Sequence, residues 1–340
     1  MKTLLAALSA FMSVGSIVAA AFGQAPLSYR QVAAMPLGAP ERWDYVIADA
    51  PSGRVFVAHG DRLSVVDGRG LRPIGDVTGL KGGAHGTYVS ASTGLGFTDD
   101  GEAGKAVAFD LKTLAIRATL DAAPDADATA GGERGVYVIG GDSGVITVID
   151  PAGLKVVDTV KVGGSLESAV LDNEGHLFVN GAERAEIVRI DTASNAVTAR
   201  WPVADCKSPH GMAIDPVRHR LFTSCVNGRL DVLDTQSGRE VASAPIGLGT
   251  DSAAFDPVRR RIFSSNGRDG TISVIQEVDA DTYRPLAPVK TQVGARTMAV
   301  DTSTGRLFVA SADIDPTGPT TGRRRFLPGT LKLLVFDPTK

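Results

Sequence analysis

The 340-residue sequence lacks most of the short motifs that assign an activity directly. It contains no GxSxG elbow, P-loop, HExxH, CxxC or CxxCH sequence, and no GxGxxG ahead of a helix, so the hydrolase, nucleotide, zinc-protease and haem sites that these motifs mark are not indicated. Aromatic residues are 6% and the formal net charge is −3, which gives no strong signal for nucleic-acid binding. The 21% of charged residues is typical of a globular chain.

Only one long hydrophobic run is present, and it lies at the N-terminus. Lys2 is followed by an almost uncharged apolar stretch that ends in small residues, including Ala21 and Gly23. This pattern predicts a secretory signal peptide over residues 1–23, with an uncleaved membrane anchor as the alternative. We therefore expect residues 24–340 to be periplasmic or secreted, with no membrane span once the signal is removed.

The rest of the sequence repeats at intervals of 40 to 45 residues. The clearest mark is an aromatic residue in the second strand of each unit: Phe56, Phe97, Tyr137, Phe178, Phe222, Phe263 and Phe308. Each unit holds three or four short runs rich in Val, Ile, Leu and Phe, separated by turn residues, which is the pattern of a β-propeller blade. The fold expected is all-β, a seven-bladed propeller of four-stranded antiparallel blades.

The blades are expected at residues 41–80, 81–123, 124–163, 164–204, 205–247, 248–292 and 293–340 of a single domain over 24–340. The third strand of the last unit is LKLLVFD, and only three residues follow it. Residues 28–38 look like a fourth strand with nothing before it. We expect them to complete the last blade, because closing the ring removes the open edge between the first and last blades.

Two recurring patterns carry a family resemblance. One is D-P-x-x-x-R-L-F, as in residues 215–222, and the other is V-x-V-I/L-D, as in VITVID at 145–150. They resemble the YVTN-type repeats of the YncE family of exported seven-bladed propellers, over essentially the whole mature chain. The resemblance implies a binding or scaffold protein and leaves the ligand open.

One position of the repeat is ionisable in every unit. This position lies five residues before the Asp that ends most of the first strands. It is occupied by Asp44, His85, Asp127, Glu167, His210, Asp251 and Arg296. The innermost strands of a propeller line its central channel, so these side chains are expected to form one layer at the channel mouth. This ring is predicted either to bind a ligand or to fix the blades through carboxylate–cation pairs.

The chemistry of the ring leaves two further alternatives. Carboxylates and imidazoles suit a divalent cation, although no motif spacing specifies one. With a bound cation the protein is alternatively a hydrolase or lyase of the gluconolactonase or streptogramin-lyase type, with His210 or Glu167 as general base and Arg296 stabilising an oxyanion. The catalytic residues and metal ligands remain unassigned, and no other cofactor is expected.

Side chains at the ends of the second strands are expected at the same mouth. His59, Asn180 and Asn266 belong to this rim, with His59 either a ligand contact or an exposed loop histidine. The insertion at 312–330 carries Arg323, Arg324 and Arg325 and is expected beside Arg296, as a solvated loop or as a cationic lid.

The two cysteines, Cys206 and Cys225, lie at the start and end of one hairpin. An even number of cysteines in an exported protein favours a disulfide, and the alternative is a Cys206–His210–Cys225 metal site. We expect a monomeric binding propeller whose partner is a small molecule or a protein at the channel mouth.

Overall fold

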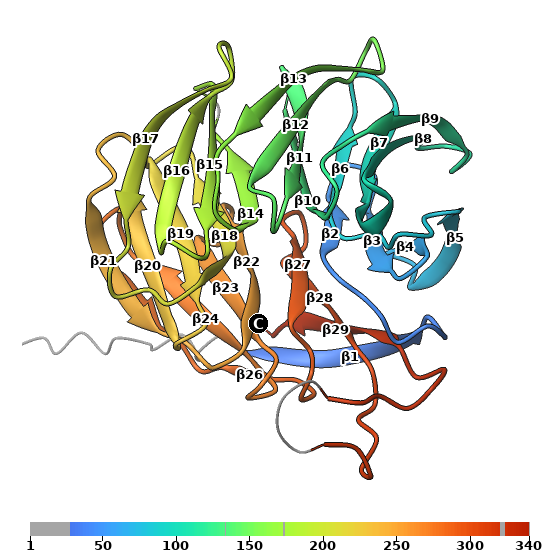
Figure 1. Ribbon diagram of the computed structural model, residues 1–340. Coiled ribbons are helices and arrows are strands. Elements are labelled where there is room, and N and C mark those ends of the chain that lie inside the picture. The colour runs from blue at the N-terminus through green and yellow to red at the C-terminus, as the bar shows by residue number, and fades with distance from the viewer. Residues whose placement is uncertain (1–27, 133, 173, 320–323, 340) are drawn as a thin grey trace, which may run out of the picture.

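The computed structural model describes residues 28–132, 134–172, 174–319 and 324–339, and within them seven antiparallel sheets surround a central axis (Figure 1). This confirms the predicted all-β, seven-bladed propeller. The predicted signal at 1–23 and Arg323 lie outside the described residues. In the described parts of the chain, no helix has the length and apolar character needed to cross a membrane.

Each of the first four sheets is built from consecutive strands in simple order. Blade 1 contains β2 (Val46–Asp49), β3 (Arg54–His59), β4 (Arg62–Asp67) and β5 (Arg72–Thr78). Blade 2 contains β6 (Thr87–Ser90), β7 (Leu95–Asp100), β8 (Lys105–Asp110) and β9 (Ile116–Asp121), with the short 3₁₀ helix η1 (Gly101–Ala103) before β8. Blade 3 contains β10 (Ala126–Gly132), β11 (Gly135–Gly140), β12 (Val145–Asp150) and β13 (Lys155–Lys161). Blade 4 contains β14 (Leu166–Leu171), β15 (His176–Gly181), β16 (Glu186–Asp191) and β17 (Ala196–Pro202).

The remaining blades depart from this plan in two places. Blade 5 is regular, with β18 (Pro209–Asp215), β19 (Arg220–Cys225), β20 (Arg229–Asp234) and β21 (Glu240–Pro245). Blade 6 contains β22 (Thr250–Asp256), β23 (Arg261–Asn266), β24 (Thr271–Glu277) and two short strands, β25 (Tyr283–Pro285) and β26 (Val289–Lys290), that both pair with β24. Its outer strand is therefore broken in two. The strands of every sheet fall within the blade range expected from the sequence.

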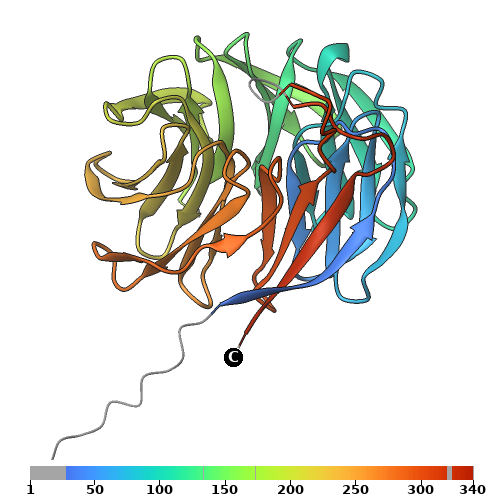
Figure 2. The ribbon, with the colours of Figure 1, turned by 90° about the horizontal axis from the view of Figure 1, so that it is seen from below.

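The seventh blade joins the two ends of the chain. Its sheet has the order β1 (Tyr29–Pro36), β29 (Lys332–Pro338), β28 (Arg306–Ser311) and β27 (Thr297–Asp301). β1 runs antiparallel to β29 from the Tyr29–Pro338 pair to the Pro36–Lys332 pair, and Figure 2 shows the two strands side by side. The predicted closure by the N-terminal strand is thus confirmed.

The seven repeat aromatics form the contacts between blades. All seven are at most 1% exposed. Phe56 of blade 1, for example, packs in one cluster with Val107 and Phe109 of blade 2. The second strands are buried on both faces because each lies between neighbouring sheets.

The innermost strands of the blades are β2, β6, β10, β14, β18, β22 and β27, and each contacts the next around the axis. They are antiparallel to the second strands, so the start of each inner strand lies beside the end of a second strand and the start of a third. We call this end of the channel the mouth. The insertion at 312–330 connects β28 to β29 at the same end.

On the opposite end of blade 6, β24 finishes on a fully buried carboxyl group. Glu277 is 0% exposed, and neither of its oxygens meets a hydrogen-bond partner among the described residues. Burial and the nearby charge of Asp215 raise the pKa of Glu277 to about 7, against the opposing effect of Arg218 at 3.6 Å. The folded state therefore binds a proton that the unfolded chain releases at lower pH.

Glu277→Gln is expected to stabilise the protein above pH 7 but not at pH 4. In the wild type, the stability gained from the raised pKa of Glu277 is fully present below 4.5, the pKa in the unfolded chain. It is lost as the pH rises through about 7, the pKa in the folded protein. At pH 8 the variant should gain about 1–3 kcal/mol of unfolding free energy, because the amide cannot ionise. Denaturant unfolding at pH 4 and pH 8 measures the difference. Glu102→Gln, at a side chain that is 74% exposed, is the control. A gain of the same size at both pH values would contradict the assignment.

Candidate functional site

The seven ring residues lie where the sequence predicts, at the starts of the seven inner strands. Asp127, Glu167, His210 and Asp251 lie within the inner strands. Arg296 directly precedes its strand, and Asp44 and His85 lie two residues before theirs. Because each comes from a different blade, only the closed fold brings them to one level.

Acidic and basic side chains of neighbouring blades form three pairs across the ring. Arg296 Nε lies 2.6 Å from Asp251 Oδ2, His210 Nε2 lies 3.5 Å from Glu167 Oε1, and His85 Nε2 lies 3.9 Å from Asp127 Oδ1. Asp44 completes the ring between the Arg296 and His85 blades. Among the described residues, its carboxylate has no hydrogen bond or ion pair. The acidic groups of the ring are therefore only partly paired with basic groups of the ring.

His85 is oriented by a buried carboxylate that the ring position alone does not reveal. Asp99, at the end of β7, is 0% exposed and accepts hydrogen bonds from His85 Nδ1 at 3.0 Å and from the His85 backbone N–H at 2.8 Å. Its second oxygen accepts the N–H of Gly86 and the hydroxyl of Thr129. The Asp99 bond occupies Nδ1, so Nε2 is the nitrogen that faces Asp127.

Arg296 is held by an aromatic ring and a backbone carbonyl. Its guanidinium carbon lies 5.3 Å from the centre of the Trp43 ring, and Nη2 donates to Trp43 O at 2.9 Å. Trp43 also packs against Phe326, with ring centres 4.9 Å apart. The insertion at 312–330 therefore contacts the ring through Trp43.

Crowding of carboxylates raises several pKa values in the ring. Burial and the charge of Asp251 raise the pKa of Asp44 to about 8, and burial and the charges of Asp127 and Asp251 raise that of Glu167 to about 9. Burial alone lowers the pKa of His85, but the hydrogen bond and charge of Asp99 outweigh it and raise the pKa to about 9. At neutral pH, protons on these groups offset the excess of carboxylates.

One part of the ring has the composition of a cation site. One ligand atom each from Asp44, His85 and Asp127 lie within 4.8 Å of one another. Two carboxylates and an imidazole suit a divalent ion. Glu167 and His210 lie further round the ring, on blades 4 and 5.

Two of the residues predicted at the rim of the mouth, His59 and Asn266, are buried. His59 is neither exposed nor at the mouth surface, because it is 0% exposed and its ring nitrogens bond Ser64 Oγ and Pro40 O, each at 3.0 Å. Asn266 is also buried and contacts Ser273 Oγ at 2.9 Å. Both side chains hold the blade together instead of lining a ligand site.

Asn180 is buried too, yet it acts on the ring. Its side-chain nitrogen donates to the backbone oxygen of His210 at 2.7 Å, and Thr223 donates to its side-chain oxygen at 2.9 Å. Asp99 occupies the equivalent fifth position of its own second strand. A polar residue at the fifth position of a second strand is therefore the sequence signal for Asp99 and Asn180.

Arg324 and Arg325 form bonds within the insertion itself. Arg325 Nε lies 2.7 Å from Asp315 Oδ2, and Arg324 donates to the Pro319 carbonyl at 3.2 Å. The Ile314–Phe326 bridge joins the two arms of the insertion. Arg325 is thus already paired, which weakens the idea of a cationic lid.

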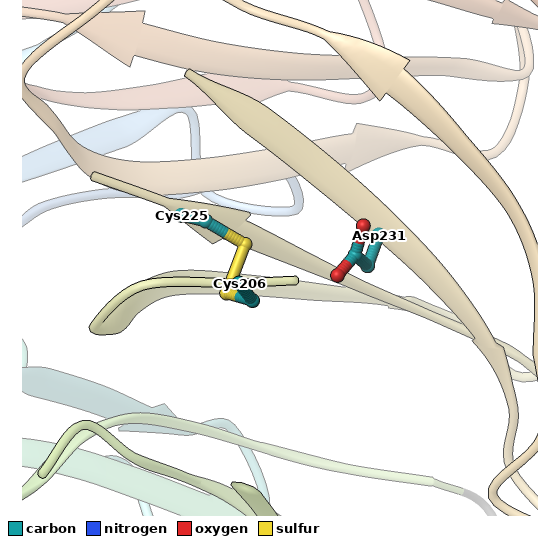
Figure 3. Close-up of side chains that lie close together, drawn as sticks. All are labelled: Cys206, Cys225 and Asp231. Atoms are coloured by element: carbon teal, nitrogen blue, oxygen red, sulfur yellow. A yellow bond between two sulfur atoms is a disulfide. The ribbon is translucent and has the colours of Figure 1, made fainter. Parts of the chain in front are cut away.

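The cysteines form the predicted disulfide, with an S–S distance of 2.07 Å and Cα atoms 5.2 Å apart. It joins the segment before β18 to the end of β19, next to the Pro209–Cys225 register pair. The alternative Cys206–His210–Cys225 site is not formed, because His210 faces Glu167. Figure 3 shows a different neighbour of the disulfide, Asp231 of β20.

Comparison with known proteins agrees with this architecture. No family model matches the chain. It is 27% identical over 183 residues to the "Uncharacterized protein YncE" of Salmonella typhimurium, covering 52% of this chain and 50% of that protein. It is 30% identical over 131 residues to the protein of the same name from Escherichia coli K12, covering 36% of each. The chain thus aligns with about half the length, or less, of the curated relatives it matches.

Solved structures match over most of the chain at low identity. "Structure of U3-55K" has a TM-score of 0.74 at 9% identity, covering 91% of this chain and 98% of that one. "Crystal Structure of Mitotic Checkpoint Complex" has a TM-score of 0.71 at 13% identity, covering 91% and 96%. Such likeness shows the fold alone. The chain is therefore a seven-bladed β-propeller that is similar to the YncE proteins over about half of its length or less.

Proposed function

We propose that the chain is an exported binding propeller that holds a small molecule, or a short segment of a partner protein, at the channel mouth. The observation that carries the proposal is the ring itself, in which seven blades each contribute one ionisable side chain to one level. Export rests on the hydrophobic run at residues 1–23.

The charges of the ring favour a ligand with a positive or hydrogen-bond-donating group. Four ring carboxylates and Asp99 face one guanidinium and two imidazoles. The guanidinium of Arg296 is already paired with Asp251 at 2.6 Å, which leaves the Asp44 carboxylate without a partner in the described part of the chain. A cationic group would replace the proton that Asp44 retains at neutral pH because of its raised pKa, since complementary charge guides recognition.

A divalent cation is the simplest ligand of this kind. The carboxylates of Asp44 and Asp127 and Nε2 of His85 would hold it, and Asp99 would keep the imidazole in the required orientation, as outer carboxylates do for metal-binding histidines. A small organic cation would use the same carboxylates.

Ring variants should lose ligand-induced stabilisation. In a thermal-shift screen of Ca²⁺, Mg²⁺, Zn²⁺ and small amines, a ligand at about 100 times its Kd adds roughly 2.7 kcal/mol to stability, a shift of about 3 °C or more. We expect Asp44→Asn and the Glu167→Gln/His210→Ala double variant to lose most of that shift.

The matched control is Asp121→Asn, which removes a 90% exposed carboxylate on the outer strand β9. It should respond to every ligand as the wild type does. Elemental analysis and EDTA treatment of the purified protein test whether a metal is the occupant. Ring variants that respond like the control would show that the ring is structural.

A further inference from the structure

A buried carboxylate beside the disulfide has no structural partner for one of its oxygens. Asp231, the third residue of β20, is 0% exposed. One oxygen accepts a hydrogen bond from Arg229 Nε, and the other has no hydrogen-bond partner among the described residues. Burial raises the pKa of Asp231 to about 6, against the opposing effect of Arg229. Burying such a group costs free energy unless another interaction compensates for it.

The fold itself does not require a carboxylate at this position. In blades 3 and 6 the third residue of the third strand is Thr147 or Ser273, whose hydroxyl accepts the backbone N–H of Ala123 or Gly247 at 3.1 Å. Ala123 and Gly247 each lie four residues before a ring residue.

In blade 5 the residue four positions before the ring histidine is Cys206. Its backbone N–H is bonded to Val203 O at 2.9 Å instead. Asp231 therefore does not accept this backbone N–H, as the hydroxyl does in blades 3 and 6.

The carboxyl group of Asp231 lies close to the two sulfurs. Ligand atoms of Cys206, Cys225 and Asp231 all lie within 4.8 Å of one another, and Figure 3 shows the carboxylate of Asp231 beside the S–S bond. The two sulfurs come from residues that are 1% and 0% exposed. His210 does not join them, because its Nε2 lies 3.5 Å from Glu167.

We propose that Cys206, Cys225 and Asp231 form a redox-gated site for a soft divalent cation such as Zn²⁺ or Cd²⁺. The oxidised protein has the disulfide, and the reduced protein has two thiolates and a carboxylate as ligands. Zinc accepts sulfur and carboxylate ligands in proteins. The charges also balance, because three anionic ligands match the cation and the guanidinium of Arg229. The site is separate from the channel ring, so it does not depend on the proposed function.

The chemistry requires a dithiol reductant. Thiol–disulfide exchange breaks the Cys206–Cys225 bond, gives each cysteine sulfur a proton, and converts the dithiol to its own disulfide. The cation then binds as the two thiols release their protons. Because both sulfurs are buried, we expect reduction to follow local opening of the segment before β18.

The test is titration of the reduced, full-length protein with Cd²⁺ in the absence of oxygen. Thiolate-to-cadmium charge-transfer absorption reports bonds to sulfur, which the ring residues cannot produce. We expect one equivalent to bind to the reduced wild type and no such absorption in the oxidised protein. Asp231→Asn should weaken the affinity at least about tenfold, the smallest loss usual when a residue supporting a metal is removed.

The matched control is Asp205→Asn. Asp205 also faces Arg229, at 4.0 Å, but its side chain is 77% exposed, so its replacement should leave the Cd²⁺ affinity unchanged. Asp231→Ser, which introduces the residue type found at this position in blades 1 and 6, replaces Asp231→Asn if the amide variant does not fold. The proposal fails if reduced wild type shows no charge-transfer band, or if the Asp231 variant binds Cd²⁺ as tightly as the Asp205 variant.

Discussion

Removal of residues 28–38 from the mature chain is expected to lower the melting temperature by roughly 10 °C or more, since several kcal/mol of pairing and burial are lost. The deletion removes β1, which pairs with β29 over its whole length. It also removes Met35, which is 7% exposed and packs in the cluster that contains Trp43 and Phe308. The exposed β29 would become an open edge, so aggregation should increase as well.

Differential scanning calorimetry of chains that begin at residue 24, 28 or 39 measures this effect. The chain beginning at residue 28 is the control and should melt with the full mature chain. A synthetic peptide of residues 28–38, added in excess to the shortest chain, should restore part of the loss by mass action. An unchanged melting temperature for the shortest chain would contradict the conclusion that β1 stabilises the ring by closing it.

Replacing both cysteines by alanine is expected to reduce the free energy of unfolding by about 3 kcal/mol, the usual effect of opening a loop of this length. The disulfide spans 19 residues, from Cys206 to Cys225. It holds the segment that leads to His210 against β19. Urea unfolding of the oxidised wild type and the double variant measures the loss.

Two controls separate the cross-link from the side chains themselves. Wild type treated with a dithiol should unfold close to the double alanine variant, whereas the variant should not respond to the dithiol. Denatured, untreated wild type should contain no reactive thiol. Detection of two thiols per chain would rule out the disulfide in the purified protein.

The blades could be predicted from the sequence because the residues that repeat are the ones that pack between neighbouring blades. An aromatic residue recurs once per unit because each blade must fill the same space against its neighbour, and all seven of these residues are buried. The broken outer strand of blade 6 was not predicted. Tyr283–Pro285 and Val289–Lys290 are too short to show strand periodicity.

The candidate site was predictable in position and less so in detail. Counting from the repeat placed the ring at the inner strands, but the same counting placed His59 and Asn266 at the rim, where they are buried instead. Alignment gives the level of a residue along a strand, whereas the direction of its side chain depends on what packs around it. Asp99 and Asn180 show the same limit, because their contacts with His85 and His210 cross between strands or blades.

The sequence by itself determined the number of blades, the closing strand, the ring position and the pairing of the cysteines, because each follows from a repeated spacing or from a count. Only the tertiary structure decided which charges pair across the ring, which carboxylate lacks a partner, and that Asp231 instead of His210 faces the disulfide. These features depend on distances between residues from different blades or strands. Such distances are set when the sheets close around the axis, and they leave no periodic trace in the chain.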